Sequence, residues 1–429
     1  MTAQRTSITS LTTPDLASHL TLVCDELGRR TDHDAVQLLR TLEHLGRSMG
    51  DLGRCLGASA WTGPAHRETR TSPTASVKAS RAASHPAECR ASPLRRLSMP
   101  EPAAVPVPVF LTMAGVREDR PGPAWRALLK ATWPSYRAWY ASEGWDRRST
   151  LQESRSALRQ HMPELLPVWQ QLVASSGDDS DVARMLALWN PPAFAPGCSQ
   201  LVASGRSRAL LRNYDYDPAL FEGVSMSSRW DERRVIGTSD CLWGLLDGMN
   251  DRGLAVSLTF GGLPGTGDGF AIPLVLRYLL EVCDSVADAR RVIDRIPVAA
   301  SYNLTLTDRS GVVVTAFLAP GRAPEYFDMP LATNHRGLVP DRPDLARRFR
   351  SVERQDVLRR LDRESRSADV AAEAFLSPSL RSTDFEGGFG TLYTADYRPD
   401  DGVVTYRWPG ATWRRTFASA DDEIRVRLR

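Results

Sequence analysis

The stretch at residues 62–98 does most to limit what this chain can fold into. It consists mainly of Ala, Ser, Thr, Pro and Arg and contains almost no large apolar side chains. A segment of this composition cannot bury enough apolar surface to offset the entropy lost on ordering, so we predict a disordered linker. The linker is basic, although the whole chain of 429 residues has a net charge of only +3. It divides the chain into a short part, residues 1–61, and a long part, residues 99–429.

The overall composition is that of a globular protein. Hydrophobic residues make up 42% of the chain and charged residues 24%, which allows a sizeable core. No apolar run reaches about 18 residues and no secretory leader is evident, so we expect a cytoplasmic protein without a membrane span. The near balance of charge gives no case for a nucleic-acid partner. Six scattered cysteines, without a CxxC pair or nearby histidines, predict neither a disulfide framework nor a bound metal.

The short part before the linker has the pattern of two helices. Large apolar residues recur at alternating steps of four and three over residues 33–56, which places them on one stripe of a helix. A shorter helix is predicted between Pro14 and Gly28, and the two would form a helical hairpin of unknown role. Because two helices bury little surface alone, we expect residues 14–57 to self-associate or to bind a protein partner.

The long part combines helical and strand patterns. Ahead of Gly197 the apolar spacing predicts a strand at 105–113 and helices at 124–141, 151–161, 164–175 and about 182–189. Beyond Gly197 short apolar runs predict strands at 206–213, 233–237, 254–260, 302–307 and 312–317, with helices at 272–283 and 286–296. Strands with helices between them suggest stacked sheets with helical layers.

Chemically distinctive residues lie where the helical pattern gives way to strands. Cys198 stands in Pro196-Gly197-Cys198-Ser199, and a cysteine after a glycine in an apolar context is on position alone more often structural than catalytic. Fourteen residues later comes Arg212-Asn213-Tyr214-Asp215, a polar cluster that closes an apolar strand. An arginine beside a thiol lowers its pKa and favours the thiolate, and a nearby carboxylate can hold an amine.

These two motifs resemble the start of the mature subunit in the acyl-coenzyme A:6-aminopenicillanic acid acyltransferase family. That family belongs to the N-terminal nucleophile hydrolases and is similar to choloylglycine hydrolase and penicillin V acylase. Further stretches follow in the family's order, namely Gly248-Met249-Asn250-Asp251-Arg252-Gly253-Leu254-Ala255, Thr333-Asn334-His335 and Ser351-Val352-Glu353-Arg354. The resemblance extends over residues 105–418.

The resemblance implies an α+β fold, a four-layer αββα sandwich, made as an inactive precursor that cuts itself between Gly197 and Cys198. Residues 99–197 would form the pro or α part and residues 198–429 the mature β part, with the severed N-terminal chain retained. The thiol would attack the Gly197 carbonyl, and hydrolysis would then free an α-amine whose ordinary pKa of about 7.7–8.0 suits a base. No cofactor is implied, although acyl-coenzyme A is a candidate substrate.

The family's catalytic roles are carried over to five residues of this sequence. Cys198 would be the nucleophile, Asp215 would orient the amine and Arg212 would polarise the site. Asn334 would donate to the oxyanion, and Arg354 would brace the cluster, although surface ion pairs on a helix are an alternative role for Arg354 and Arg212.

One part of the sequence departs from the family pattern. Related hydrolases often offer a side-chain amide to the oxyanion where this chain reads Leu258-Thr259-Phe260-Gly261-Gly262. The second donor would be the Thr259 hydroxyl or a backbone N–H of this stretch. We expect Trp243, Phe260 and the loop at 261–269 to form the substrate pocket, with a plain core role for Trp243 as the alternative.

The sequence therefore predicts a self-processing enzyme that moves or hydrolyses an acyl group through an acyl-cysteine intermediate. Its partners would be a small-molecule acyl donor and either an amine or water as acceptor. An amidase of N-acyl amino acids or related conjugates, with water as acceptor, is one alternative. An alternative of another class is a non-catalytic binding or regulatory module that acts through the N-terminal helices and the basic linker.

Overall fold

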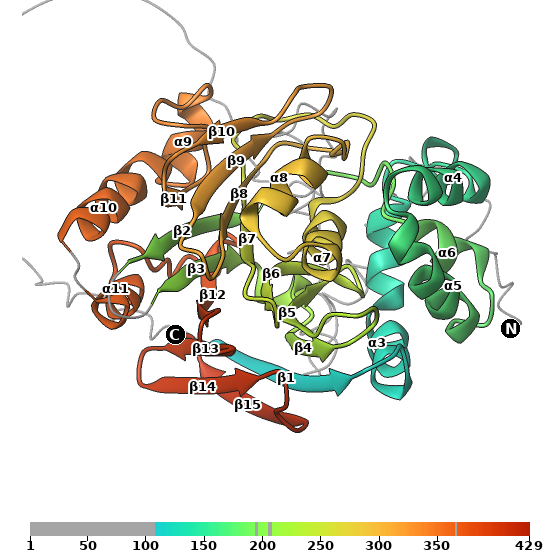
Figure 1. The fold of residues 1–429 in the computed structure, drawn as a ribbon, viewed down its shortest axis with the longest axis horizontal. Helices are drawn as coiled ribbons and strands as arrows, with labels where there is room; N and C mark the ends of the chain where they lie inside the picture. The colour runs from blue at the N-terminus through green and yellow to red at the C-terminus, as the bar shows by residue number, and fades with distance from the viewer. Residues whose placement is uncertain (1–107, 194–195, 205–207, 365–366) are drawn as a thin grey trace, which may run out of the picture.

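A computed structural model describes residues 108–193, 196–204, 208–364 and 367–429 (Figure 1). The helical hairpin predicted for residues 1–61 and the linker predicted for residues 62–98 lie outside the described residues. No helix of the described ranges is long and apolar enough to cross a membrane.

The larger of two sheets contains nine strands in the described residues. Neighbouring strands run antiparallel except for the parallel pair of β1 and β4. Its spatial order is β10 (Glu325–Phe327), β9 (Val313–Leu318), β8 (Tyr302–Thr307), β7 (Ala255–Phe260), β6 (Gly244–Asn250), β5 (Val235–Asp240), β4 (Val224–Ser228), β1 (Phe110–Glu118) and β15 (Asp422–Arg427). The first and last described strands of the chain are therefore paired at one edge of this sheet.

The smaller sheet is antiparallel throughout and has six described strands. Its spatial order is β11 (Leu331–Ala332), β2 (Gly197–Ala203), β3 (Ala209–Tyr216), β12 (Gly390–Arg398), β13 (Val403–Trp408) and β14 (Ala411–Thr416). Cys198 is the second residue of β2, which pairs along its whole length with β3.

The side chains of β2 show how the two sheets stack. Successive residues of a strand point to opposite faces. The amide of Gln200 lies between the hydroxyls of Ser257 and Thr305, which belong to the larger sheet. The next residue, Leu201, instead packs in a cluster with Phe375 of the outer helix layer. One face of β2 thus meets the larger sheet, and the other meets helices.

Helices cover the outer faces of both sheets (Figure 1). Helix α7 (Ile272–Val282) contacts β6 and β7, and α8 (Val286–Ile293) follows it. On the opposite side, α10 (Ser351–Glu364) and α11 (Ala368–Phe375) contact β2 and β3, with α9 (Pro343–Arg348) beside α10. The layer order is αββα, which confirms the four-layer sandwich predicted from the sequence.

A helical group from before Cys198 lies beside the sheets (Figure 1). It contains α3 (Pro123–Tyr140), α4 (Leu151–His161), α5 (Leu166–Ser175) and α6 (Ser180–Leu186), with short 3-10 turns at η2 (Trp145–Arg147) and η3 (Pro163–Leu165). A third turn, η4 (Pro218–Leu220), follows β3. Thr150 and Glu153 form a capping box at the start of α4, where each satisfies a free backbone N–H of the first turn.

Candidate active site

Cys198 is buried between the two sheets of the intact chain. Its side chain is fully inaccessible to solvent. The pairing of β2 with β3 sets Cys198 opposite Tyr214 and Gly197 opposite Asp215. Because side chains alternate along a strand, the thiol points to the larger sheet, whereas Asp215 points to α10. Two groups of polar side chains therefore meet the Gly197–Cys198 peptide from its two faces.

The first group is centred on Arg212, which lies on the same face of the smaller sheet as Cys198. Its Nη2 donates to the Cys198 sulfur at 3.2 Å. Its Nε donates to the carbonyl of Leu258 at 3.1 Å, and its Nη1 donates to Tyr393 Oη at 3.0 Å and to the carboxylate of Asp247. The guanidinium is fully buried and has partners on all three nitrogens, so its position at the sulfur is fixed.

The protonation state of the thiol follows from its burial. Burial raises the pKa of Cys198 to about 11, and the positive charge of Arg212 opposes this only in part. From the sequence, an arginine near Cys198 predicts a lowered pKa of the thiol. In the intact chain the loss of solvent around the thiol has the larger effect and raises its pKa. The thiol is therefore protonated at neutral pH while the Gly197–Cys198 bond is uncut.

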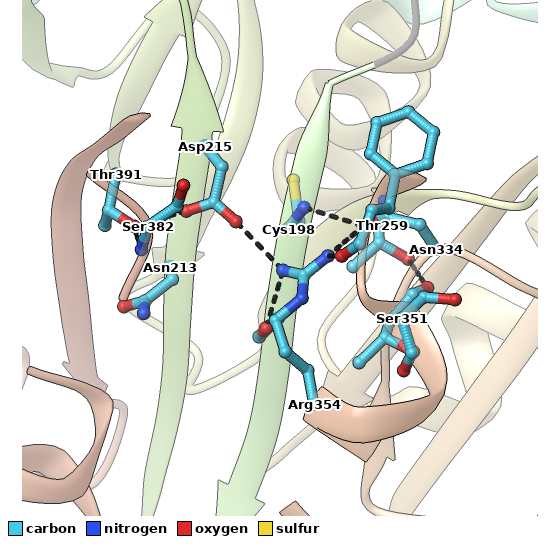
Figure 2. A network of polar contacts seen from close by, with 12 residues as sticks. Cys198, Asn213, Asp215, Thr259, Asn334, Ser351, Arg354, Ser382 and Thr391 are labelled. Carbon is cyan, nitrogen blue, oxygen red and sulfur yellow. Dashed lines mark hydrogen bonds and ion pairs between the residues drawn. The ribbon is translucent and has the colours of Figure 1, made fainter. Parts of the chain in front are cut away.

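The second group is centred on Arg354 of α10. Figure 2 shows its guanidinium between Asp215 and Asn334. Nη1 lies 2.9 Å from Asp215 Oδ2 and donates to Ser199 Oγ at 2.9 Å, while Nη2 donates to Asn334 Oδ1 and to the carbonyl of Phe349, both at 2.6 Å. Arg354 is only 4% exposed, so its role as a surface ion pair on a helix is wrong. It instead links α10 to β3 through Asp215, to β2 through Ser199 and to the segment after β11 through Asn334.

The Asp215 carboxylate is buried and fully engaged. One oxygen pairs with Arg354, and the other accepts from Thr391 Oγ1 at 2.5 Å. Burial raises the pKa of Asp215, whereas Arg354 and Thr391 lower it by stabilising the charged form. Asp215 is therefore held between Arg354 and Thr391, opposite Gly197 in the pairing of β2 with β3.

Asn334 holds the backbone on both sides of Gly197. Its Oδ1 accepts the N–H of Cys198 at 3.0 Å, and its Nδ2 donates to the carbonyl of Pro196 at 3.1 Å. Asn334 comes shortly after the end of β11 in the chain, and β11 pairs with β2. One amide thus bridges the two peptide groups that flank Gly197.

The three residues predicted to form the substrate pocket are engaged in other contacts. The Thr259 hydroxyl donates to the carbonyl of Thr333 at 2.7 Å and accepts from Asn303 at 3.1 Å, so its proton is already engaged. Phe260 is buried against Phe349, with ring centroids 6.0 Å apart. Trp243 is fully buried and donates from Nε1 to the carbonyl of Leu186 at 2.8 Å, which is the core role given above as its alternative.

Asp247 of β6 was not identified from the sequence. Its carboxylate accepts from Arg212, from the hydroxyls of Tyr393 at 2.7 Å and Tyr397 at 2.6 Å, and from Thr238 Oγ1 at 2.6 Å. Four donors from both sheets therefore surround one buried carboxylate. Asp247 is the single charged residue of β6, and this was the only sequence signal for the position.

A cavity of about 420 Å³ opens beside Gly197, Asp215 and Arg354. A much smaller one, of about 10 Å³, lies against Pro191 and Cys241 and has room for about one water molecule. Neither is lined by Trp243, Thr259 or Phe260. The described residues contain no group of three or more His, Cys, Asp or Glu side chains that could hold a metal ion.

Two stacked sheets with helices on both outer faces form the αββα sandwich that the resemblance to N-terminal nucleophile hydrolases implied (Figure 1). The model of the family described as acyl-coenzyme A:6-aminopenicillanic acid acyl-transferase matches residues 202–413, just under half of the chain. This match confirms the resemblance over that range, which includes Arg212, Asp215, Asn334 and Arg354 and begins after Cys198.

Among solved structures, similarity is found to conjugated bile acid hydrolase from Clostridium perfringens and to penicillin V acylase from Agrobacterium tumefaciens. The bile acid hydrolase structure, which is of a mutant, shares 12% sequence identity with this chain. The similarity covers 53% of this chain and 96% of the hydrolase chain, with a TM-score of 0.38. The penicillin V acylase shares 14% sequence identity. The similarity covers 49% of this chain and 82% of the acylase chain, with a TM-score of 0.34. No curated protein matches the chain.

Proposed function

We propose that this protein is a self-processing enzyme with an N-terminal cysteine nucleophile. The observation that carries the proposal is the arrangement around the Gly197–Cys198 peptide. Asn334 bridges the backbone groups on either side of Gly197, Arg212 contacts the Cys198 sulfur, and Arg354 joins Asn334 to Asp215. Two buried arginines next to the Gly197–Cys198 peptide are costly to maintain, because each buried charge must be compensated.

The proposed cleavage begins with the thiol. Cys198 Sγ loses its proton and attacks the carbonyl carbon of Gly197, forming a C–S bond. The C–N bond to Cys198 then breaks, and its nitrogen takes up the proton to become an amine. Water hydrolyses the thioester, which releases a carboxylate on Gly197 and restores the thiol. A glycine at this position is favoured by close packing, since an added Cβ would lie 3.2 Å from Asp215 Cβ.

The same residues acquire new roles once the peptide is cut. The new α-amine of Cys198 lies next to Asn334 Oδ1, and its ordinary pKa near 8 suits it as a base for the thiol. When the Pro196 carbonyl moves away from the site, Asn334 Nδ2 keeps only its contact with the carbonyl of Phe260 at 3.5 Å and can donate to an oxyanion. One such donor is worth about 3 kcal/mol of the barrier. Since the Thr259 proton is engaged, a backbone N–H is the better candidate for the second donor.

The mature enzyme would move an acyl group from an amide or thioester onto Cys198 and then to an amine or to water. The family match over residues 202–413 supports this reaction class. Acyl-coenzyme A remains the candidate thioester donor, and the proposal needs no cofactor. Incubating the processed protein with acyl-coenzyme A and amines, and separately with N-acyl amides alone, distinguishes a transferase from an amidase by its products.

Intact mass spectrometry of the purified full-length chain tests the cleavage. We expect a fragment that spans residues 198–429, and we expect Cys198→Ala to abolish it. Cys283→Ala is a matched control, because this cysteine is also buried but lies away from the site at the end of α7. A wild-type chain that stays at full length after prolonged incubation would show that the proposal is wrong.

A further inference from the structure

Gln200 is a buried amide two residues after the proposed nucleophile. It lies on β2 and is fully inaccessible to solvent. Because side chains alternate along a strand, Gln200 shares the face of Cys198, toward the larger sheet. Its directly paired neighbour on β3 is Arg212, whose guanidinium contacts the Cys198 sulfur. The three side chains therefore lie together on the inner face of the smaller sheet.

All four hydrogen-bonding positions of the Gln200 amide are used by the larger sheet. With its nitrogen toward β7, the amide donates to the hydroxyl of Ser257 at 2.5 Å and to the Ser257 carbonyl at 3.2 Å. Its oxygen accepts from the hydroxyl of Thr305 on β8 at 2.8 Å and from the Thr305 N–H at 3.3 Å. An amide has two donor hydrogens and two acceptor positions, so each has a partner. Gln200 thus links β2 to two neighbouring strands of the larger sheet.

These links reach the same part of β7 as Arg212 does. Arg212 Nε donates to the carbonyl of Leu258, the residue after Ser257. The paired strands β2 and β3 are therefore attached to consecutive residues of one strand. The bonds of Gln200 set where β2 lies on the larger sheet, and the bond of Arg212 sets where β3 lies. The separation of the Cys198 sulfur from the guanidinium depends on both.

The first two residues of β2 after the proposed cut have fewer strand partners than the rest. β11 pairs with β2 only at Gln200 and the residue after it. In the described part of the chain, Cys198 and Ser199 therefore pair with a strand on one side only, that of β3. The N–H of Cys198 is held on the other side by the Asn334 side chain. Once the peptide is cut, Gln200 is the residue nearest to the free end that both neighbouring strands and the larger sheet hold.

Packing alone does not account for an amide at this position. A buried amide costs free energy unless its bonds are made, and an apolar side chain of the same length would fill the same space. Apolar contacts are non-directional, whereas hydrogen bonds weaken when distances and angles change. Four directed bonds therefore resist a small shift or tilt of β2 more strongly than apolar packing would.

We propose that Gln200 is a positioning residue for the nucleophile, which holds the start of β2 on the larger sheet so that the Cys198 sulfur stays beside Arg212 in the processed enzyme. The inference rests on the proposed function, because it takes Cys198 as the nucleophile. It assigns no contact with substrate to Gln200. A thiol beside a guanidinium ionises more readily, so the placement of β2 sets the fraction of reactive thiolate.

The ionisation of Cys198 in the processed protein tests this role. Its rate of alkylation by iodoacetamide, located by peptide mass spectrometry from pH 6 to pH 10, gives the pKa of the thiol. We expect Gln200→Met, which keeps the length of the side chain but removes its bonds, to raise this pKa by about one unit, a tenfold loss of thiolate at lower pH. Asn213→Leu is the matched control. The Asn213 amide is also buried and bonded, but to Thr394 and the carbonyl of Phe375 on the opposite face, so we expect an unchanged pKa.

A second comparison separates position from stability. In the Cys198→Ala background, denaturant unfolding should show a loss of stability for Gln200→Met, because the hydroxyls of Ser257 and Thr305 lose a partner. Adding Ser257→Ala and Thr305→Val removes both hydroxyls, and an apolar replacement of all partners with the same shape is nearly neutral. We expect this triple variant to regain stability and, with Cys198 present, to keep the raised thiol pKa.

Three results would overturn the inference. The thiol pKa is unchanged in Gln200→Met, it rises equally in Asn213→Leu, or it returns to the wild-type value in the triple variant, which would mean that Gln200 acts through stability alone. If Gln200→Met stays uncut, cleavage of the triple variant decides in place of the pKa: an uncut chain of restored stability supports the inference, and cleavage at the wild-type rate overturns it. An uncut wild-type chain would overturn the proposed function and this inference together, whereas a processed protein with an unchanged pKa overturns this inference alone.

Discussion

The position of Arg212 depends on a residue that never touches Cys198. Asp247 accepts from the Arg212 guanidinium and from three hydroxyl groups, so both of its oxygens are satisfied inside the core. Arg212 in turn has only one nitrogen directed at the sulfur. Asp247 is therefore a positioning residue, because its charge keeps the buried guanidinium at the cysteine.

Asp247→Asn keeps the shape of the side chain but removes that charge. Breaking a buried ion pair costs about 3–5 kcal/mol, so we expect a loss of this order in the free energy of unfolding. We also expect slower self-cleavage, since Arg212 is no longer held at the thiol. Denaturant unfolding in the Cys198→Ala background measures the first effect. Mass spectrometry of the single variant, at a temperature where it is folded, measures the second.

Asp396→Asn provides the comparison for this prediction. Asp396 is also buried and pairs with Arg407 at 2.7 Å, but it contacts no residue of the candidate site. We expect it to reduce stability without slowing cleavage in the folded protein. If both variants slow cleavage equally, Asp247 acts through stability alone and has no positioning role.

The first turn of α10 is attached to the segment that carries Asn334. His335 Nδ1 lies 2.8 Å from Ser351 Oγ, and its Nε2 lies 3.3 Å from Gln355 Oε1. Thr333 Oγ1 also donates to the carbonyl of Ser351 at 2.8 Å. These contacts couple the segment after β11 to α10, so Asn334 and Arg354 reach the start of β2 as one unit.

This coupling predicts a dependence of stability on pH. Burial lowers the pKa of His335, the contact with Gln355 opposes this in part, and Arg359 and Arg354 act in the same direction as burial. A group whose pKa is lower in the folded state contributes stability above its unfolded pKa, near 6.5, and loses it as the pH falls. We expect His335→Gln, in the Cys198→Ala background, to lose less unfolding free energy than its parent between pH 7 and pH 5. Equal losses, measured by denaturant unfolding, would contradict this.

The elements also show what the sequence could and could not predict. Helices such as α4 and α5 were predicted within a few residues, because their apolar spacing repeats every turn. Strand β2 was not predicted, since all seven of its residues are buried and it lacks the alternation of a half-buried strand. Cys198 and Arg212 were identified through local motifs, whereas the hydroxyl bond of Thr259 depends on Thr333, which is distant in sequence.

At the scale of the whole molecule, the proposed cut would divide one folded body into two interleaved chains. Strand β1, from before Cys198, lies between β4 and β15, which come after it. Trp125 and Met113 are fully buried, and Trp125 Nε1 donates to the carbonyl of Leu242 at 3.1 Å. Each large apolar side chain that stays covered is worth about 1.5–3 kcal/mol.

We therefore expect the two fragments to remain bound after self-cleavage. On size-exclusion chromatography without denaturant, the processed protein should elute at the volume of the uncut Cys198→Ala chain, and denaturing gels of that peak should show both fragments. In concentrated guanidinium chloride they should separate, because only packing and β-pairing join them. Elution of residues 198–429 alone would contradict this, and it would also mean that β4 and β15 tolerate the loss of β1 from between them.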